Sequence, residues 1–175
     1  HPDHMEGLFS VAQKYKIDSI IANEDISESK GYLLFFEVVK GKGIEFKQVK
    51  RGDIINRFKK VEIEILHPDK LTGNWNNDSL AMKLTYKKVS FLFVADIGQK
   101  ICDGLAEHYK ERLKSTVVKI PHHGKAGGGE FIRKASPEVA VLSVDPSIWG
   151  GPSEEILAEY KDSKIPLLRT DEKGT

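Results

Sequence analysis

The sequence predicts a mixed α/β fold, with sheets covered by outer helices, in a single domain over residues 1–175. The first observation is that hydrophobic spacing alternates along the chain between the period of a helix and the period of a strand. The second is length, because 175 residues match one domain and can bury a substantial core. The third is that the chain contains no internal repeat, linker or low-complexity segment.

The first half of the chain is predicted to be helical at its start and then rich in strands. The helix at 5–16 is expected to bury Leu8, Val11 and Ala12. In the strand at 60–66, apolar residues at every second position alternate with Glu62 and Glu64, the pattern of a strand with one buried face. The predicted elements are a helix at 5–16, a strand at 19–22, a helix at 30–41, and strands at 44–49, 53–58, 60–66, 79–87 and 89–95.

The second half is predicted to alternate regularly between helix and strand. Its first helix carries apolar residues spaced by four, at Ile101, Leu105, Tyr109 and Leu113, which form a buried stripe. Pro152, followed by a serine and then two glutamates, is typical of a helix start. The predicted elements are helices at 98–114, 127–135 and 152–162, and strands at 116–120, 138–144 and 165–169.

Composition and charge give evidence against two classes of function, a membrane span within this chain and a basic groove for nucleic acid. No stretch approaches the roughly 18 consecutive apolar residues that a membrane span needs. The formal net charge of +1 gives no support for a basic groove that binds nucleic acid. Cys102 is the single cysteine, so an internal disulfide is impossible, and we interpret this residue as part of a helix core.

Two histidine clusters and one aspartate are the candidate site. The clusters are His1 with His4 and His122 with His123, and each lies where a predicted strand gives way to a loop or helix. Asp96 ends a strongly apolar strand, where a carboxylate is unfavourable unless a positive charge compensates it. Imidazole nitrogen and carboxylate oxygen suit zinc or manganese, and two ions could share a bridging hydroxide. Such a centre lowers the pKa of bound water to about 7.

Each of these features also has a purely structural interpretation. The His1–His4 segment could be an ordinary loop with an aspartate-based turn. The pair His122-His123 before a glycine could be a polar turn. Asp96 could cap the helix that follows it. Their occurrence together and in this order favours a metal site.

The segment His1-Pro2-Asp3-His4, followed by Gly7, resembles the H-x-H-x-D-H motif of the metallo-β-lactamase superfamily. This resemblance implies an αββα sandwich. It also implies that the first histidine of the motif lies upstream of His1, together with strands of the first sheet. The chain starts without a methionine and closes on a turn at 171–175, so we expect a fragment cut from a longer protein.

Further motifs are similar to the C-terminal hydrolase domain of ComEC-type competence (DNA-internalisation) proteins and their stand-alone relatives. These motifs occur in one order as Leu66-His67-Pro68, Asn76-Asn77-Asp78-Ser79-Leu80, Phe91 to Ile97, His122-His123-Gly124 and Arg169 to Gly174. The resemblance covers essentially the whole chain.

The resemblance implies a role for each site residue. His1 would help to bind a first metal ion, Asp3 and His4 a second, and Asp96 would bridge both. Asp3 would also orient the attacking water. His123 would be a second-metal ligand. His122 would contact substrate or donate a proton. Asn77 and Ser79 stand where many members carry a further metal-binding histidine, and its absence implies a weaker or single-ion first site or an amide that completes the shell, with both residues close to the substrate. Apart from the resemblance, the position of Lys125 beside the paired histidines suggests that it would hold a phosphate of the substrate.

Several positions depart from the subgroup pattern. His1 stands where the subgroup has aspartate, and Lys125 replaces its usual serine. Gly150-Gly151-Pro152 replaces a Gly-His-Pro, so one histidine near the active site is missing. Ala95 replaces a glycine before Asp96, which we interpret as a small change.

Other residues keep open interpretations. His67 is interpreted as structural or as a support for a ligand. Trp75 either lines a substrate cleft or covers the sheet edge. Gly127-Gly128-Gly129 is either a mobile rim or the approach to a helix.

The function that follows is hydrolysis by a metal-bound hydroxide with zinc or manganese, two ions per intact domain. Phosphodiesters are the expected substrate, either a small molecule or single-stranded DNA during DNA uptake. The alternatives are hydrolysis of another ester, lactone or amide, and a degenerate domain that serves as a binding module. A ComEC-like parent would contain a membrane domain and place this domain outside the membrane, whereas a stand-alone relative would be secreted or cytoplasmic.

Overall fold

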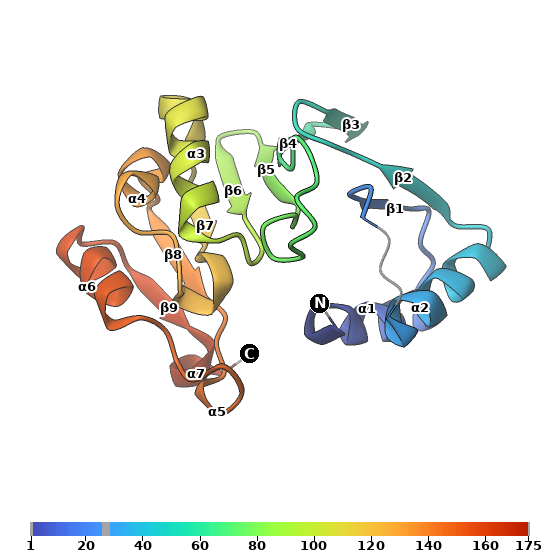
Figure 1. Ribbon diagram of the computed structural model, residues 1–175. Coiled ribbons are helices and arrows are strands. Elements are labelled where there is room, and N and C mark those ends of the chain that lie inside the picture. The colour runs from blue at the N-terminus through green and yellow to red at the C-terminus, as the bar shows by residue number, and fades with distance from the viewer. Residues whose placement is uncertain (1, 26–28, 175) are drawn as a thin grey trace. The chain divides into compact units, whose positions relative to one another are not determined.

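The computed structural model describes residues 2–25 and 29–174 and divides into two compact units, His1–Lys50 and Arg51–Thr175. The expectation of a single domain stays a prediction. The elements of both units are labelled in Figure 1.

The N-terminal unit is built from two helices and a two-stranded parallel sheet. Its elements, in order, are α1 (Pro2–Lys14), β1 (Ser19–Ala22), α2 (Lys30–Gly41) and β2 (Glu45–Gln48). The parallel register pairs Ser19 with Glu45 and Ala22 with Gln48, so α2 connects the two strands as a βαβ crossover. Ser29 caps the start of α2 by accepting a hydrogen bond from the N–H of Tyr32 at 3.3 Å.

The core of this unit lies between the two helices and the sheet. Ala12, Phe35, Val39 and Ile44 are buried there. The predicted buried stripe of α1 is therefore correct at Ala12 and wrong at Leu8 and Val11, which are half exposed. Phe9 packs against this core, three residues before Ala12, so the helix turns a neighbouring stripe inward.

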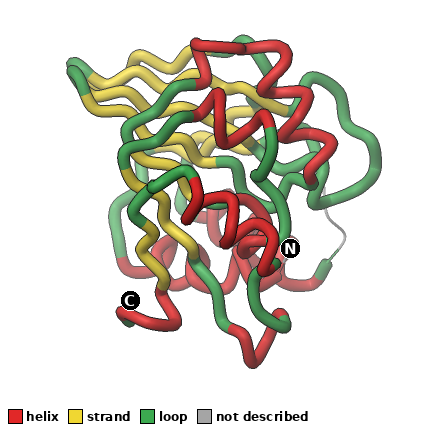
Figure 2. The backbone as a smooth tube through the Cα atoms, turned by 90° about the vertical axis from the view of Figure 1, so that its left-hand side faces the viewer, coloured by secondary structure: helices red, strands yellow, loops and turns green. Residues whose placement is uncertain are grey.

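The C-terminal unit contains a seven-stranded sheet, whose strands run side by side as one layer (yellow in Figure 2). The strand order is β3-β4-β5-β6-β7-β8-β9, antiparallel from β3 to β6 and parallel from β6 to β9. Its strands are β3 (Ile54–Phe58), β4 (Val61–His67), β5 (Ala81–Tyr86), β6 (Val89–Phe93), β7 (Val117–Lys119), β8 (Val139–Leu142) and β9 (Leu167–Arg169).

Three helices pack on one face of this sheet and enclose its main core. They are α3 (Gln99–Tyr109), α4 (Glu130–Ala135) and α6 (Glu154–Asp162). Leu92 of β6, Val118 of β7 and Ala140 of β8 are fully buried against them, because alternate residues of each strand point to the same face. The predicted stripe of α3 is confirmed at Leu105 and Tyr109, which are buried.

Three short helical segments of the described chain were not predicted from the sequence: a 3₁₀ turn at Pro121–Gly124, helix α5 at Pro146–Trp149 and helix α7 at Thr170–Lys173. A further 3₁₀ turn, at Lys110–Leu113, forms the end of the helix that was predicted at 98–114. The turn at Pro121–Gly124 carries the paired histidines. Each segment is four residues long, too short for hydrophobic periodicity to reveal.

Within residues 2–25 and 29–174, no helix combines the length and the hydrophobicity that a membrane crossing requires.

Candidate metal centre

The candidate centre lies at the carboxyl ends of three neighbouring parallel strands. Asp96 follows β6, His122 and His123 follow β7, and Ser143 follows β8. Because the carboxyl ends of parallel strands meet at one edge of a sheet, residues distant in sequence converge there. The predicted convergence of Asp96 with the paired histidines is therefore a feature of the C-terminal unit itself.

The backbone at this edge is held in an uncommon conformation. Ala95, His122 and His123 have φ angles of 44°, 48° and 52°, in the left-handed region. The N–H of His122 donates to the carbonyl oxygen of Ala95 at 3.0 Å, which joins the two segments. Left-handed backbone is unfavourable by about 1–2 kcal/mol for a residue with a Cβ. The interpretation of alanine for glycine at position 95 as a small change is therefore wrong in energetic terms.

His123 is oriented by its main-chain surroundings. Its Nδ1 lies 2.9 Å from the carbonyl oxygen of Ser143. A carbonyl oxygen only accepts hydrogen bonds, so Nδ1 carries the proton and donates it. In the neutral ring, Nε2 then keeps its lone pair, which is the form that binds a metal ion.

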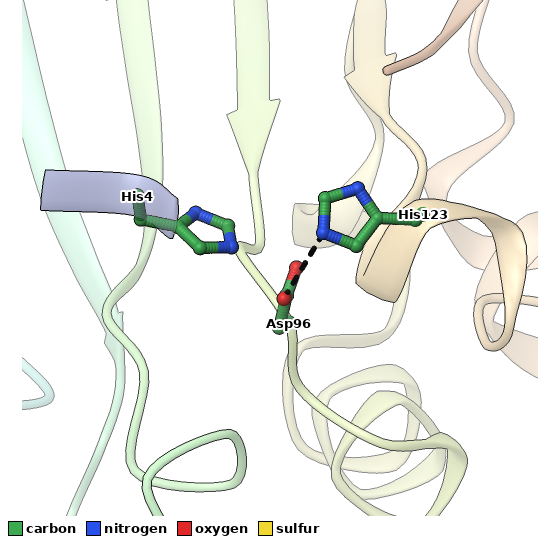
Figure 3. Close-up of side chains that lie close together, drawn as sticks. All are labelled: His4, Asp96 and His123. Atoms are coloured by element: carbon green, nitrogen blue, oxygen red, sulfur yellow. Dashed lines mark ion pairs between the residues drawn. The ribbon is translucent and has the colours of Figure 1, made fainter. Parts of the chain in front are cut away.

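The lone pair of His123 is directed at the Asp96 carboxylate. Nε2 lies 3.3 Å from Oδ2 of Asp96, and both side chains are buried (Figure 3). A neutral imidazole nitrogen and a carboxylate oxygen are both acceptors, so their contact is favourable when a proton or a bound cation lies between them.

The residues present fit a metal ion. Two ligands that are each about 2.0–2.1 Å from one tetrahedral ion lie about 3.3 Å from each other. This separation agrees with the 3.3 Å between Nε2 of His123 and Oδ2 of Asp96. One nitrogen and one oxygen donor, both buried, suit zinc, manganese or iron.

Asp96 does not cap helix α3. The N-cap residue of that helix is Gly98, and its N–H donates to Oδ1 of Asn77 at 3.3 Å. The structural interpretation of Asp96 as a helix cap is therefore wrong.

Lys119 approaches the other oxygen of Asp96. Its Nζ lies 3.6 Å from Oδ1 of Asp96 and donates to the carbonyl oxygen of Ala95 at 3.2 Å. Burial lowers the pKa of Lys119, and the neighbouring Asp96 charge opposes this change. Hydrophobic spacing could not single out this lysine, because it is the last residue of a short strand.

His122 lies beside the centre and is partly exposed. Burial lowers its pKa, and the positive groups of Lys125 and Lys119 act in the same direction, against the attraction of Asp96. Its Nε2 lies 3.5 Å from Nδ2 of Asn76, so the neutral ring faces an amide donor. Sequence reasoning selected Asn77 and Ser79 in this loop and missed Asn76.

The loop that carries these residues is organised around a buried carboxylate. Asp78 is completely buried and accepts hydrogen bonds at 2.8 Å from the N–H and hydroxyl of Thr72 and from the N–H of Gly73. Sequence reasoning gave no role to Asp78. Its signal was only that an acidic residue sits inside an Asn-Asn-Asp-Ser turn.

Asn77 and Ser79 form hydrogen bonds with neighbouring parts of the protein. The carbonyl oxygen of Asn77 accepts a hydrogen bond from Nε2 of His67 at 2.6 Å. The hydroxyl of Ser79 donates to the carbonyl oxygen of Trp75 at 3.3 Å. The role of Asn77 and Ser79 in substrate binding stays a prediction. His67 has a structural role, which was one of its two interpretations from the sequence. The side chain of Trp75 is 51% exposed.

The remaining predicted site residues are Lys125 in the C-terminal unit and three residues near the start of the N-terminal unit. Lys125 is exposed and is separated from the paired histidines by Gly124. His4 belongs to helix α1 of the N-terminal unit. His1 and the side chain of Asp3 lie outside the described residues. Metal binding by these three N-terminal residues stays a prediction.

The triple glycine is a packed segment. The N–H groups of Gly127 and Gly128 both donate to Oε1 of Gln99, and the N–H of Gly129 donates to Glu159. A Cβ on Gly127 would lie 2.6 Å from Pro121, so this segment supports the turn that carries the histidines. Both interpretations from the sequence, a mobile rim and a plain helix approach, therefore missed its close packing.

Comparison with solved structures identifies the fold. A candidate metal-dependent hydrolase from Parabacteroides distasonis aligns with a TM-score of 0.54 at 14% identity, over 90% of this chain and 78% of that one. The metallo-β-lactamase fold protein YhfI from Bacillus subtilis aligns with a TM-score of 0.52 at 11% identity, over 97% and 69%. CmlA, a diiron β-hydroxylase from Streptomyces venezuelae, aligns with a TM-score of 0.58 at 13% identity, over 97% and 42%.

At these identities the likeness shows the fold alone. The chain is a mixed α/β protein with the metallo-β-lactamase fold, as the sequence predicts. Neither a protein-family model nor a curated protein sequence matches the chain significantly. The sandwich arrangement of two sheets concerns both units and stays a prediction.

Proposed function

We propose that this protein is a metal-dependent hydrolase whose centre is built on Asp96 and His123. The observation that carries the proposal is the separation of 3.3 Å between Oδ2 of Asp96 and Nε2 of His123, both buried. Placement at the carboxyl ends of parallel strands, where α/β folds hold their ligands, supports it further.

The sequence motif supports additional ligands from the N-terminal unit. His4, Asp3 and His1 correspond to positions of the superfamily motif and would complete the coordination shell. Zinc and manganese both suit such a set of imidazole and carboxylate donors. Because CmlA is a diiron enzyme with this fold, iron belongs in the same test.

The chemistry can be divided between the cation and the side chains. A bound divalent cation acidifies water and polarises the bond under attack. His122, neutral because burial lowers its pKa, stands beside the centre where it exchanges a proton with the reacting groups. Lys125, an exposed residue two positions after His123, would hold an anionic part of the substrate. Asp3 would orient the attacking water, as the motif implies.

Phosphodiesters are the substrate class that we favour. The support is the resemblance of the motifs to ComEC-type hydrolase domains, together with Lys119 and Lys125 close to the paired histidines in sequence. Single-stranded DNA during DNA uptake is the macromolecular form of this substrate. Hydrolysis of another ester, lactone or amide is the alternative, because one fold carries many substrates.

The test combines metal analysis with two model substrates. Elemental analysis and calorimetric titration with Zn²⁺ and Mn²⁺ are made on the wild type, on Asp96→Ala and on the control Asp162→Ala, which changes an exposed residue of α6. Hydrolysis of bis(p-nitrophenyl) phosphate is compared with that of p-nitrophenyl acetate.

We expect metal binding and phosphodiester hydrolysis in the wild type and in Asp162→Ala, and loss of both in Asp96→Ala. Hydrolysis of the acetate ester alone would replace the phosphodiester with the alternative substrate class. If the wild type binds no metal in the presence of excess ion, the proposed function is contradicted. The remaining interpretation is then a degenerate domain that serves as a binding module.

A further inference from the structure

The two oxygens of Asp96 have different partners. Oδ2 lies 3.3 Å from Nε2 of His123, whereas Oδ1 lies 3.6 Å from Nζ of Lys119. One side of the carboxylate therefore faces a potential metal ligand, and the other side faces an ammonium group.

Lys119 is held in this place. Its Nζ also donates to the carbonyl oxygen of Ala95 at 3.2 Å, and only 20% of the side chain is exposed. The residue pairs with Val141 in the register of β7 and β8, so its aliphatic stem lies on the sheet beside an apolar neighbour. An ammonium group with a carbonyl and a carboxylate as partners is a fixed positive charge.

We propose that the Lys119 ammonium is the second cation of the centre, so that this protein binds a single divalent ion where two were expected from the sequence. The inference rests on the proposed function, because it concerns the same Asp96. A carboxylate bridges two metal ions either with one oxygen for each ion or with a single shared oxygen. In both arrangements the second divalent ion comes close to the ammonium group beside Oδ1. Here Oδ1 already faces a positive charge, and a divalent ion brought to the same oxygen would be repelled by it.

A second observation agrees with one ion. Many superfamily members carry a further histidine ligand at the positions of Asn77 and Ser79. In this chain Oδ1 of Asn77 accepts the N–H of Gly98, and the Ser79 hydroxyl donates to the Trp75 carbonyl oxygen. The Asn77 bond joins the loop to the start of α3, whereas the Ser79 bond lies within the loop. Both side chains are therefore held by the protein itself, and we do not expect either to replace the histidine as a ligand.

The experiment measures metal stoichiometry and affinity independently of turnover. Zn²⁺ is titrated calorimetrically into the metal-free wild type, Lys119→Met, Lys119→Arg and Lys83→Met. Lys83 is a matched control, because it is also partly buried and its Nζ also donates to a main-chain carbonyl oxygen, that of Arg112 at 2.8 Å. Circular dichroism checks that each variant is folded, and elemental analysis confirms the bound ion.

We expect one equivalent of Zn²⁺ in the wild type. Removal of the ammonium in Lys119→Met leaves the Asp96 charge for the metal alone, so Zn²⁺ should bind about tenfold more tightly or to a second equivalent. Lys119→Arg keeps the charge and Lys83→Met lies elsewhere, so both should bind as the wild type does.

The possible failures are distinguishable. Two equivalents in the wild type, with Lys119→Met unchanged, would overturn the role of Lys119 and leave the metal-dependent function standing. No binding to any variant would overturn the proposed function itself. If Lys119→Met does not fold, a Lys119→Arg variant that gains a second equivalent would still contradict the inference, because the positive charge is retained.

Discussion

His123 donates its Nδ1 proton to the carbonyl oxygen of Ser143 at 2.9 Å, which leaves Nε2 directed at Asp96. The main chain after β8 thus selects the ring tautomer of a residue that follows β7. The hydrogen bond needs no second side chain, so substitutions at position 143 should preserve it. The orientation of the ring therefore depends on the pairing of the two strands.

From the backbone conformation of Ala95 we expect that a glycine at this position stabilises the protein. Its φ of 44° is unfavourable for a residue with a Cβ, so Ala95→Gly should raise the free energy of unfolding by about 1 kcal/mol. Urea denaturation of the metal-free protein measures this change. Ala106→Gly, in the interior of α3, is the control and should destabilise the protein by about 1 kcal/mol or more. A loss of stability in Ala95→Gly would show that this conformation is not retained in solution.

We expect His67 to make the folded protein less stable at acidic pH. Burial lowers its pKa from the ordinary 6.5, so the unfolded chain binds this proton more readily than the folded protein does. The contribution of His67 is fully present above pH 6.5 and declines as the pH falls below that value towards the folded-state pKa. Urea midpoints measured at about pH 7.5 and about pH 5 should show the decline.

The matched variant for this experiment is His67→Gln. Glutamine keeps a side-chain N–H that can donate to the carbonyl oxygen of Asn77, the bond that His67 makes at 2.6 Å, but it does not titrate. The decline in stability between the two pH values should be smaller in this variant. An equal decline would assign the pH dependence to other groups.

We expect the substitution of Asp78 to cause a large loss of stability. Its buried carboxylate accepts three hydrogen bonds from Thr72 and Gly73, and Asp78→Ala would leave their donors without it. We expect a decrease of about 3 kcal/mol in the free energy of unfolding. The same loop holds Asn76 beside His122, so the proposed hydrolysis of bis(p-nitrophenyl) phosphate should also be slower in this variant.

The control lies in the same region of the chain. Asp69 is exposed and forms an ion pair with Arg51 at 2.7 Å. Exposed ion pairs contribute about 0–1 kcal/mol, so Asp69→Ala should have little effect on unfolding by urea. Equal losses in the two variants would contradict the special role of Asp78.

We expect the effects of substitutions at Gly128 and Glu159 on stability to be coupled. A Cβ on Gly128 would lie 2.6 Å from the Glu159 carboxylate, which accepts the N–H of Gly129. Gly128→Ala should therefore displace that carboxylate and destabilise the protein by about 1–2 kcal/mol. In a Glu159→Ala background the same substitution should be nearly neutral. A double-mutant cycle of urea denaturation measures the coupling, and additive effects would exclude it.

Much of the fold and part of the site could be predicted from the sequence. The alternation in β4 and the apolar spacing of α3 follow from the periods of strand and helix, so both elements were located closely. Asp96 and the paired histidines each follow a predicted strand, which indicated that their side chains meet at one edge of the sheet. Periodicity and motif order carry that information because they are local.

Only the tertiary structure decided how the site is completed. The Ser143 carbonyl oxygen, the Lys119 ammonium and the Asn76 amide reach the site residues from three different segments. No local pattern marks a main-chain carbonyl or one lysine among many as a partner. The sequence by itself thus determined the α/β elements and the ligand types. Strand order, register and left-handed backbone at Ala95 determined which charges face each other, because these depend on contacts between residues far apart in the chain.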